Sequence, residues 1–528
     1  MISKIKSFGI NGIEGYIVDV EIDIRKSLPG YVLVGLPDTS IKESKERVHS
    51  AIINCGIKFP IGKIVINLAP ADTRKEGVIY DLPIALGILA AAGQVDERKL
   101  HEFAFVGELS LNGEIRKING VLPILIAARA NGVKKIIIPT DNAEEASFIA
   151  KSDESDIDCV EVFTADNLLE VLKFFGAEIG ADNKITTLPH VEHKSFDKIR
   201  EQLPYSADLK YVKGQYIAKR ALEIAAAGGH NLLLIGPPGS GKTMMAKCFP
   251  TILPDLTYDE SIEVTKIHSI AGVLDAATGM VVNRPFRTPH HTASLIALAG
   301  GGKNAKPGEI SLAHNGVLFL DELPEYPRSS LEMLRQPLED NKITIARVAA
   351  TVDYPAAFTL IASMNPCPCG HHGSRTQRCT CTPTAINKYL ARLSGPLMDR
   401  IDLHIEVDNV TYDDLTTTDL EESSAAVKER VDGARKIQLT RFEPENNNKK
   451  TKVFCNAKMT TQQAKRYCKL SSEGQRILKE AFEKLQLSAR AYTRILRVAR
   501  TIADLDASAD INVEHIQEAV GYRSLDRK

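Results

Sequence analysis

The stretch that decides the fold is Ile235-Gly236-Pro237-Pro238-Gly239-Ser240-Gly241-Lys242-Thr243, which follows the apolar run Leu232-Leu233-Leu234. A strand, a glycine-rich loop and a helix are expected in that order. In such a loop the glycines let backbone N–H groups turn inward on a phosphate, the lysine reaches the β and γ oxygens, and the Thr hydroxyl can bind Mg²⁺. The predicted nucleotide-binding residues are therefore Gly236, Pro237, Pro238, Gly239, Ser240, Gly241, Lys242 and Thr243.

A second motif supplies two carboxylates downstream of this loop. The apolar run from Gly316 to Leu320 is suited to a parallel strand buried on both faces, and it ends in Asp321 and Glu322. Acids at the carboxyl end of such a strand face the nucleotide crevice. Asp321 can hold Mg²⁺ through its water shell, and Glu322 can polarise the attacking water. The alternative is a strand that merely ends in a charged turn.

Composition limits the remaining possibilities. A chain of 528 residues favours about three or four structural units. A net charge of -1 does not indicate a nucleic-acid or membrane partner, so any basic surface must be local. The N-terminus lacks a secretory apolar region, and the longest apolar run, Leu82 to Gly93, is too short to cross a bilayer. We therefore expect a cytoplasmic protein without a membrane partner. Nine cysteines in such a chain are not a disulfide framework.

Residues 1–175 alternate short strand-like and helical runs, which predicts a separate α+β domain. The stretch from Gly107 to Ile118, with the helix that follows it, resembles the proteolytic domain of Lon. Lon cleaves peptides with a Ser–Lys pair, but the matching positions here hold Ile79 and Leu122. Neither nucleophile nor base can be assembled. We interpret the domain as catalytically degenerate and used for assembly or partner binding; an active protease is the alternative.

The rest of the chain divides into a linker, a motor core and a lid. Residues 176–205 are polar and irregular, which predicts a linker. Asp208 to Gln215 precedes an amphipathic helix and the phosphate loop, an arrangement that resembles AAA+ ATPases and favours ATP over GTP. A parallel-sheet AAA+ core is expected over 206–409 and a helical lid over 410–528, interrupted by the polar loop from Pro444 to Lys450. The predicted fold class is thus multidomain α/β.

Three further residues match AAA+ positions that respond to the γ-phosphate. Asn365 ends the next strand, Phe358 to Ser363, and matches the first sensor. Arg400 precedes a later strand and matches the arginine finger, which neutralises charge on a neighbouring subunit's ATP and implies a ring. Arg490 matches the second sensor, with Arg494 next in rank. Since no acid occurs from Lys484 to Ala503, we expect Arg490, Arg494 and Arg497 to be locally unpaired and to face an anion.

Segments inserted in the predicted AAA+ core indicate which branch of the AAA+ proteins the chain resembles. Arg284 to Ser294, Gly300 to Glu309 and a hairpin expected from Lys342 to Val352 resemble the magnesium-chelatase and minichromosome-maintenance clade. With the Lon-like front domain, the whole chain resembles the ComM/YifB family of chelatase-like proteins. That resemblance implies a ring, expected to be a homo-hexamer, which acts as a branch-migration helicase on single-stranded or branched DNA in bacterial transformation. We interpret His290 and His291 as a packed or hydrogen-bonded pair; a metal site is the alternative.

Four thiols in two close pairs, Cys367 with Cys369 and Cys379 with Cys381, suit a tetrahedral Zn²⁺ in a loop at 366–382. His371 or His372 could replace one sulfur, and reduced free thiols are the alternative. Arg375, Arg378, Lys388 and Arg392 make this region basic, so a contact with the phosphate backbone of DNA is plausible.

The sequence therefore predicts an ATP hydrolase that moves on DNA. Lys242, Thr243 and Asp321 would bind ATP and Mg²⁺, Glu322 would activate water, and Asn365, Arg400 and Arg490 would couple hydrolysis to the ring. The alternative is a chelatase-like ATPase that remodels a protein or assists metal insertion. The basic residues expected to contact DNA in the inserts are Lys303, Lys306, Lys342 and Arg347.

Overall fold

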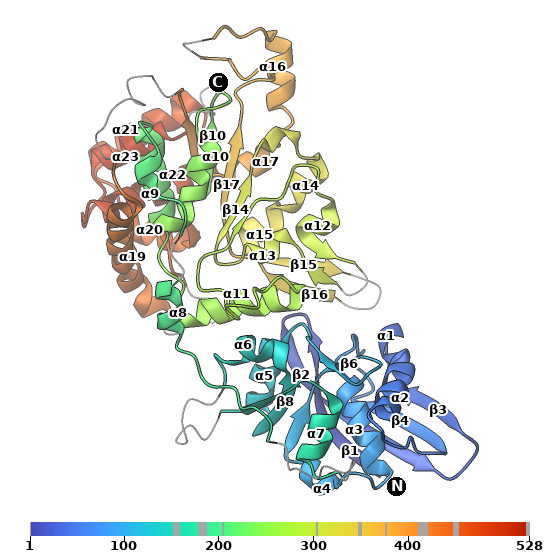
Figure 1. Cartoon of the computed structure of the whole chain (residues 1–528). Coiled ribbons are helices and arrows are strands. Elements are labelled where there is room, and N and C mark those ends of the chain that lie inside the picture. The colour runs from blue at the N-terminus through green and yellow to red at the C-terminus, as the bar shows by residue number, and fades with distance from the viewer. Residues whose placement is uncertain are drawn as a thin grey trace.

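The computed structural model describes residues 2–150, 159–177, 187–202, 205–302, 305–346, 351–374, 377–409, 421–446 and 453–523. In Figure 1 an N-terminal domain lies at the bottom, and a larger body above it holds a parallel sheet and the C-terminal helices. The predicted mixed α/β fold with a parallel-sheet core and a helical C-terminal region is confirmed.

The N-terminal domain is built on one seven-stranded sheet. Its strands, in spatial order, are β3 (Gly30–Val34), β4 (Lys63–Ala69), β2 (Glu14–Arg25), β1 (Ile2–Asn11), β5 (Phe103–Phe105), β8 (Lys135–Pro139) and β9 (Glu161–Ala165). β1 pairs with β2 antiparallel, whereas β5, β8 and β9 continue the sheet in parallel. Helix α3 (Asp81–Ala91) is buried along its whole length against β1 and β2, as its uniformly apolar sequence requires.

The remaining elements of this domain are short. They are α1 (Thr39–Lys42), α2 (Ser44–Asn54), α4 (Glu97–Leu100), β6 (Glu108–Leu109), β7 (Ile115–Arg116), α5 (Val121–Ala130), α6 (Ala143–Ala146) and α7 (Leu168–Phe174). Ile79 and Leu122, the residues at the two Lon catalytic positions, both belong to the apolar core of the domain. Neither side chain can act as a nucleophile or a base.

The region predicted to be the AAA+ core, here called the ATPase core, contains a five-stranded parallel sheet. Its strands, in spatial order, are β11 (Phe286–Arg287), β14 (Val317–Leu320), β17 (Thr359–Met364), β10 (Leu232–Ile235) and β18 (Leu403–Glu406). All neighbouring strands run parallel. The residues of β10 and β14 are fully buried, which explains why the two motifs show continuous apolar runs rather than alternation. Their functional loops consequently emerge at one edge of the sheet.

Helices and small strands surround this sheet. They are α9 (Tyr216–Gly228), α10 (Lys242–Cys248), α11 (Tyr258–Ala271), α12 (Leu295–Ala299), β12 (Gly300–Gly301), β13 (Lys306–Pro307), α13 (Glu309–Leu312), α14 (Arg328–Met333), α15 (Arg335–Asp340), β15 (Lys342–Ala346), β16 (Thr351–Pro355), α16 (Pro383–Leu390) and α17 (Gly395–Met398). The predicted hairpin is confirmed, because β15 and β16 pair antiparallel. Lys303 and Arg347 lie outside the described residues.

The C-terminal region is a cluster of helices packed on the core. Its members are α19 (Ser424–Asn446), α20 (Thr461–Tyr467), α21 (Ser472–Leu485), α22 (Ala489–Leu505) and α23 (Val513–Gly521). Helix α19 packs against both α9 and α22. It continues through Pro444 to Asn446, so the first residues of the loop predicted to interrupt the lid are helical.

One helix was not expected in the linker. α8 (Phe196–Gln202) lies within residues 176–205, which the sequence predicts to be irregular. Phe196 and Ile199 pack against a small apolar cluster formed by Phe148, Met280 and Val282. Because those partners come from both the N-terminal domain and the ATPase core, the burial that stabilises α8 cannot be seen in its own sequence.

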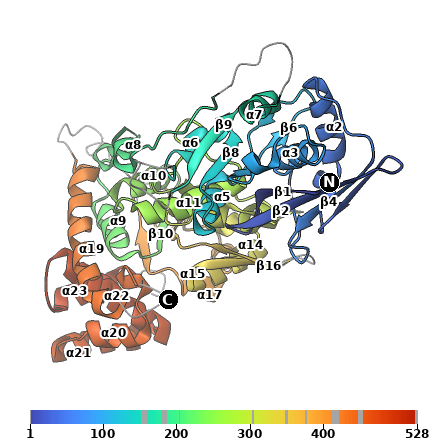
Figure 2. The same cartoon turned by 90° about the horizontal axis from the view of Figure 1, so that it is seen from below.

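Helix α11 joins the N-terminal domain to the ATPase core, and it runs along their boundary in Figures 1 and 2. The backbone N–H of Gly120 donates to Ser269 Oγ at 2.9 Å, and Ser269 Oγ in turn donates to Glu145. Glu145 also accepts from the backbone N–H of Leu122 at 2.8 Å. Burial raises the pKa of Glu145, and these hydrogen bonds only partly oppose it. Leu122, which occupies the position of the Lon lysine, therefore takes part in the contact between the two domains.

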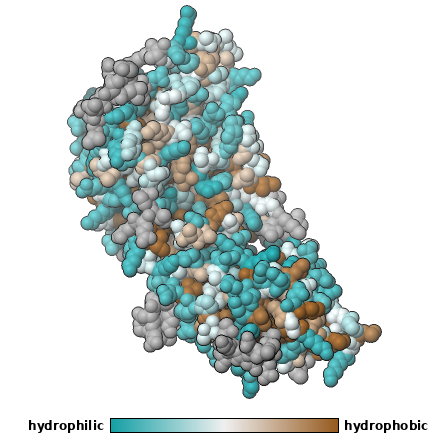
Figure 3. All heavy atoms as spheres, viewed as in Figure 1, coloured by the Kyte–Doolittle hydropathy of each residue, from teal (hydrophilic) through white to brown (hydrophobic). Residues whose placement is uncertain are grey.

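The surface view in Figure 3 shows a face on which hydrophilic residues predominate. Exposed apolar side chains include Leu28 (87% exposed) and Ile61 (79%), beside the ends of β2, β3 and β4. Among the described residues, no helix combines the length and apolarity that a membrane crossing requires.

Candidate functional site

The phosphate loop leaves β10 at Ile235 and enters α10 at Lys242, as predicted. Gly239 and Gly241 have φ values of +79° and +85°, a region that residues with a Cβ rarely adopt. Lys242 Nζ donates to the carbonyl oxygens of Gly236 (2.8 Å) and Pro237 (2.7 Å), so its ammonium group lies inside the loop. Burial lowers the pKa of Lys242, while Asp321 and Glu322 favour its charged form. The loop is thus arranged to receive anionic oxygens.

Asp321 lies at the end of β14 and contacts the first turn of α10. Thr243 Oγ1 donates to Asp321 Oδ2 at 2.9 Å. Ser363 Oγ donates to Asp321 Oδ1, which also accepts from the backbone N–H of Glu322 at 3.1 Å. A hydroxyl and a carboxylate are oxygen donors of the kind that Mg²⁺ prefers. The structure therefore brings together Thr243 and Asp321 as the sequence predicted, and it adds Ser363, which the sequence analysis did not select.

Glu322 extends from a strained turn beside Asp321. Its φ of +52° is unusual for a residue with a side chain, and such strain concentrates at functional sites. The side chain is 56% exposed, and its carboxylate lies 3.7 Å from Nδ1 of His291. The rings of His290 and His291 have centroids 4.1 Å apart, and His290 Nδ1 lies 2.8 Å from Thr292 Oγ1. This packed, hydrogen-bonded arrangement agrees with our interpretation of the pair and places one member near Glu322.

Asn365 follows the last residue of β17, directly beside the phosphate loop. The backbone N–H of Gly236 donates to the carbonyl oxygen of Met364 at 3.1 Å. Because β17 lies between β10 and β14 in the sheet, Asn365 emerges between the phosphate loop and the two acids. Its role as the first sensor stays a prediction.

Arg400 lies at the opposite end of the sheet. It precedes β18, which runs parallel to β10 with Leu232 opposite Leu403, and the side-chain amide of Asn231 donates to Arg400 O at 2.9 Å. The four residues of β10 separate this end from the phosphate loop, a distance of about 13 Å. Arg400 therefore cannot serve the phosphates of its own chain.

The Arg400 side chain does not project from the single chain. It is 4% exposed, donates from Nη1 to Pro396 O at 2.5 Å, and forms an ion pair with Glu339 of α15. Its Nε atom is buried without a hydrogen-bond partner among the described residues. Contact with a neighbouring subunit would require the guanidinium group to leave Glu339.

The arginines of α22 are only partly as expected. Arg490 is exposed in the first turn, in agreement with an unpaired cation. As predicted, no acid from the neighbouring sequence pairs with Arg494 or Arg497, but both side chains bind partners from distant segments. Arg494 forms an ion pair with Asp402, and Arg497 donates to Ala457 O at 3.0 Å. The acid that pairs with Arg494 lies 92 positions earlier, so the absence of acids from Lys484 to Ala503 did not reveal it.

Asp402 is the centre of this contact between the core and α22. Its carboxylate accepts from the backbone N–H of Asn231 at 3.1 Å and lies 3.3 Å from His230 Nδ1. His230 Nε2 is 2.8 Å from the Thr501 hydroxyl on α22. Burial alone would raise the pKa of Asp402, but Arg494, His230 and the Asn231 N–H together hold it below its usual range. This carboxylate is thus charged and fully partnered.

The four cysteines of the 366–382 loop form one cluster. Their Sγ atoms lie within 4.8 Å of one another, and Sγ of Cys367 is 3.3 Å from that of Cys369 and 3.7 Å from that of Cys379. A tetrahedron with Zn–S bonds of about 2.3 Å places its sulfurs about 3.8 Å apart. The donor set and its spacing therefore fit Zn²⁺. Within the described residues the cluster contains the four cysteines and neither His371 nor His372.

Backbone N–H groups point at these sulfurs. His372 donates to Cys367 Sγ at 3.3 Å, and Cys381 donates to Cys379 Sγ at 3.4 Å. The backbone N–H groups of His371 and Thr380 lower the pKa of Cys369 to about 5, whereas burial and the neighbouring cysteines raise the pKa of Cys379 and Cys381. Hydrogen bonds of this kind stabilise the thiolate form, which is the form that binds a metal.

Comparison with known proteins agrees with these observations. The family model "Magnesium chelatase, subunit ChlI" matches residues 208–415, and its C-terminal counterpart, "Magnesium chelatase, subunit ChlI C-terminal", matches residues 421–523. A third model, "Subunit ChlI of Mg-chelatase", matches residues 20–142. The Escherichia coli "uncharacterized protein YifB" is 45% identical over 517 residues, which are 98% of this chain and 96% of that protein. The Haemophilus influenzae "competence protein ComM" is 44% identical over 518 residues, with coverages of 98% and 96%.

This chain belongs to the ComM/YifB family. The magnesium-chelatase-like AAA+ family implies ATPase activity. The predicted likeness to Lon is also confirmed, because Lon protease 2 of Bacillus subtilis is 31% identical over 155 residues, which are 29% of this chain and 24% of that protein. The resemblances stated from the sequence therefore hold for the whole chain and for its front domain.

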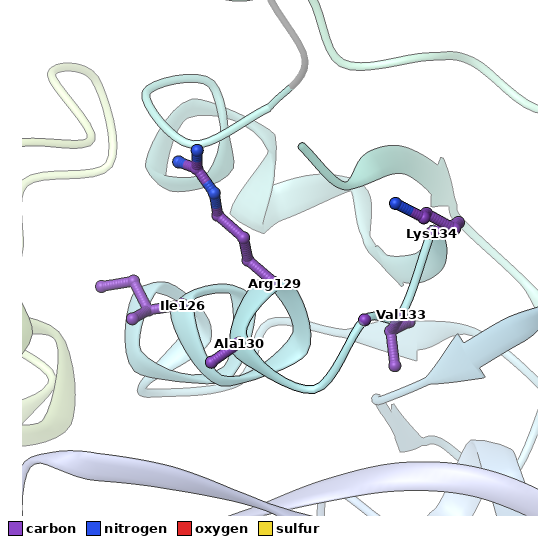
Figure 4. A pocket seen from close by; sticks show the side chains of 6 residues that line it. Ile126, Arg129, Ala130, Val133 and Lys134 are labelled. Atoms are coloured by element: carbon purple, nitrogen blue, oxygen red, sulfur yellow. The ribbon is translucent and has the colours of Figure 1, made fainter. Parts of the chain in front are cut away.

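The N-terminal domain of this ComM/YifB chain contains a hollow (Figure 4). Its volume is about 440 Å³, and its lining residues are Ile126, Arg129, Ala130, Gly132, Val133 and Lys134. The lining contains no carboxylate, thiol or hydroxyl side chain. This hollow carries no chemistry comparable to that around the phosphate loop.

Proposed function

We propose that this chain forms a ring of six identical subunits that hydrolyses ATP and uses the energy to move on single-stranded or branched DNA. The observation that carries the proposal is the assembly of Lys242, Thr243, Asp321 and Glu322 around one loop. Lys242 would bind the β and γ oxygens, Thr243 and Asp321 would hold Mg²⁺, and Glu322 would orient and deprotonate the attacking water. ATP and DNA are both available in the cytoplasm, which is the compartment we propose.

The remaining residues would act between subunits. Asn365 would sense the γ-phosphate on its own chain. Arg400 lies at the far end of the sheet, which supports a role at a neighbour's ATP once it has left Glu339. Arg490 lies one helical turn before Arg494, which is tied to Asp402 at that same end of the sheet. We infer that Arg400 and Arg490 act on the same side of each subunit.

The proposal of DNA as substrate is supported by the relative named competence protein ComM, and the proposed process is branch migration in transformation or recombination. The basic residues expected to contact DNA give this proposal weaker support. Lys306 is exposed, but Lys342 pairs with Asp353 at 2.7 Å and Arg392 pairs with Glu325 at 2.8 Å. Arg375 lies outside the described residues. Phosphate contacts by Lys342 and Arg392 would have to compete with these acids.

Those two ion pairs favour a second candidate function. An ATPase that remodels a protein partner, or assists metal insertion, needs no unpaired basic track, and the matching family models are named for magnesium chelatase. ATP turnover measured with single-stranded, double-stranded and forked DNA separates the two. The DNA motor predicts stimulation that is largest with single-stranded or forked DNA and weakens with added salt. Turnover unaffected by all three would favour the remodelling function.

We further propose that Cys367, Cys369, Cys379 and Cys381 hold one Zn²⁺ that stabilises their loop. The metal would bring the two cysteine pairs together where little apolar surface is available. Elemental analysis of protein purified without added metal should give about one zinc per chain, and the Cys379→Ser, Cys381→Ser variant should lose it. Active protein that contains no transition metal would show that the cluster holds reduced thiols.

A further inference from the structure

The segment between the sensor strand and the cysteine cluster runs along the phosphate loop. At its start, Met364 O accepts from the backbone N–H of Gly236 at 3.1 Å. At its end, Gly370 lies against the Pro238 ring so closely that a Cβ added to Gly370 would be 2.6 Å from Pro238 Cδ. The two contacts bracket the first half of the phosphate loop. Any displacement of residues 364–370 would therefore also displace the segment from Gly236 to Pro238.

Two of the four cysteines lie between these contacts. Cys367 is fully buried, and the backbone N–H of Gly370 donates to Cys367 O at 2.9 Å, which closes a tight turn. Cys369 directly precedes Gly370. Cys379 and Cys381 then approach from the other end of the loop, so the cluster ties residues 367–369 to the stretch that leads into α16.

Apolar burial cannot hold this loop in place. Among the described residues of 366–382, only Cys367 and Gly370 are buried, and the others are partly or fully exposed. A segment with so little buried surface does not offset the entropy of ordering its backbone. The convergence of four sulfurs is the one feature of the described loop that can do so, provided that a metal joins them.

We propose that the metal-bound cysteine cluster clamps the phosphate loop through Gly370 and Pro238, and so sets the affinity of the chain for ATP. The proposal rests on the zinc site proposed above. With the metal bound, residues 364–370 hold Gly236 to Pro238 in the conformation that receives phosphate. Without it, nucleotide binding must also order this segment. Affinity should fall at least about tenfold, the factor that corresponds to fixing even one residue of this segment on binding.

Two glycines of the same loop provide a matched test. Gly370 and Gly373 have φ values of +84° and +77°, so alanine is similarly strained at either position. The Cβ of Gly370→Ala would collide with Pro238, whereas that of Gly373→Ala would meet nothing within 4 Å. Neither residue supplies a metal ligand. The difference between the variants therefore reports the contact with the phosphate loop.

The readouts are zinc content by elemental analysis and the dissociation constant of a fluorescent ATP analogue, measured without DNA. We expect both variants to retain about one zinc per chain. Gly370→Ala should bind the analogue about tenfold more weakly than Gly373→Ala, which should resemble the wild type. Equal affinities of the two variants, with zinc present in both, would overturn the clamp while leaving the zinc site intact.

Removal of the metal provides a second arm. The Cys379→Ser, Cys381→Ser variant should show the same loss of ATP affinity as Gly370→Ala, and Cys55→Ser, a half-buried cysteine outside the cluster, should show none. Wild-type protein that binds the analogue but contains no transition metal would overturn the clamp and the zinc site together. Zinc-free cysteine variants that bind the analogue like the wild type would overturn the clamp alone.

Discussion

Replacement of Asp402 by alanine should loosen helix α22 from the ATPase core. The Asp402 side chain is 7% exposed and partners Arg494, His230 and the backbone N–H of Asn231. The variant leaves the Arg494 guanidinium without its acid and the Asn231 N–H without its acceptor. Breaking a buried ion pair by removing one partner costs about 3–5 kcal/mol.

The expected loss is local, so it should be measured locally. A chain of this size does not unfold in one step, and a single free energy of unfolding would not be well defined. Amide hydrogen exchange reports the opening of individual helices. We expect protection of the α22 amides, between Ala489 and Leu505, to fall about a hundredfold or more in Asp402→Ala. Helices of the N-terminal domain should be unaffected.

The exposed Asp408, near the end of β18, provides the matched control, and Asp408→Ala should leave α22 protection unchanged. The effect should also depend on pH in one direction. Because Arg494 and His230 hold the pKa of Asp402 below its ordinary value of about 3.9, the carboxylate stabilises fully above that pH, and its contribution is lost as the pH falls below it. Unchanged α22 protection in Asp402→Ala at pH 7 would refute the reasoning.

Three further predictions concern the ATP site and DNA. Glu322→Gln should retain ATP binding but slow turnover by about 10²–10⁴-fold, since an amide is no base; near-normal turnover, or an equal loss in Glu325→Gln, would remove Glu322 from this role. Arg400→Ala and Lys242→Ala should each be inactive alone, yet mixed rings should recover some ATPase activity at interfaces where both sites are intact; confirmed mixed rings without recovery would argue against the finger. Lys306→Ala and Lys342→Ala should each lower the salt slope of DNA binding by about one, as measured by titration at several salt concentrations; unchanged slopes would favour the remodelling function.

The sequence predicts the parts of the site that are local. The phosphate loop, the strand before Asp321 and the strand before Asn365 each combine a buried apolar run with polar residues at its end. Parallel strands bring those ends together at one edge of the sheet. The four cysteines are likewise close in sequence. Such patterns are decided by residues within a short window, so the structure reproduces them.

Other features depend on contacts between distant segments. Arg494 forms an ion pair with Asp402, which lies just before β18, and Arg400 forms one with Glu339 of α15. Gly370 rests on Pro238, which lies far earlier in the chain. The burial of α8 comes from Phe148, Met280 and Val282. No periodicity or spacing within these segments specifies the partner, so the pairing of Arg494 and the helix in the linker could not be predicted.

The most direct test of an ATP-driven DNA motor is displacement of a labelled strand from a forked DNA by the purified protein. The assay should compare the wild type with Glu322→Gln and Lys242→Ala, each with ATP and with a non-hydrolysable analogue. We predict strand release by the wild type with ATP alone, and none by either variant or with the analogue. Wild-type protein that hydrolyses ATP at a rate unchanged by DNA, and releases no strand from forked or single-strand-tailed substrates, would contradict the account.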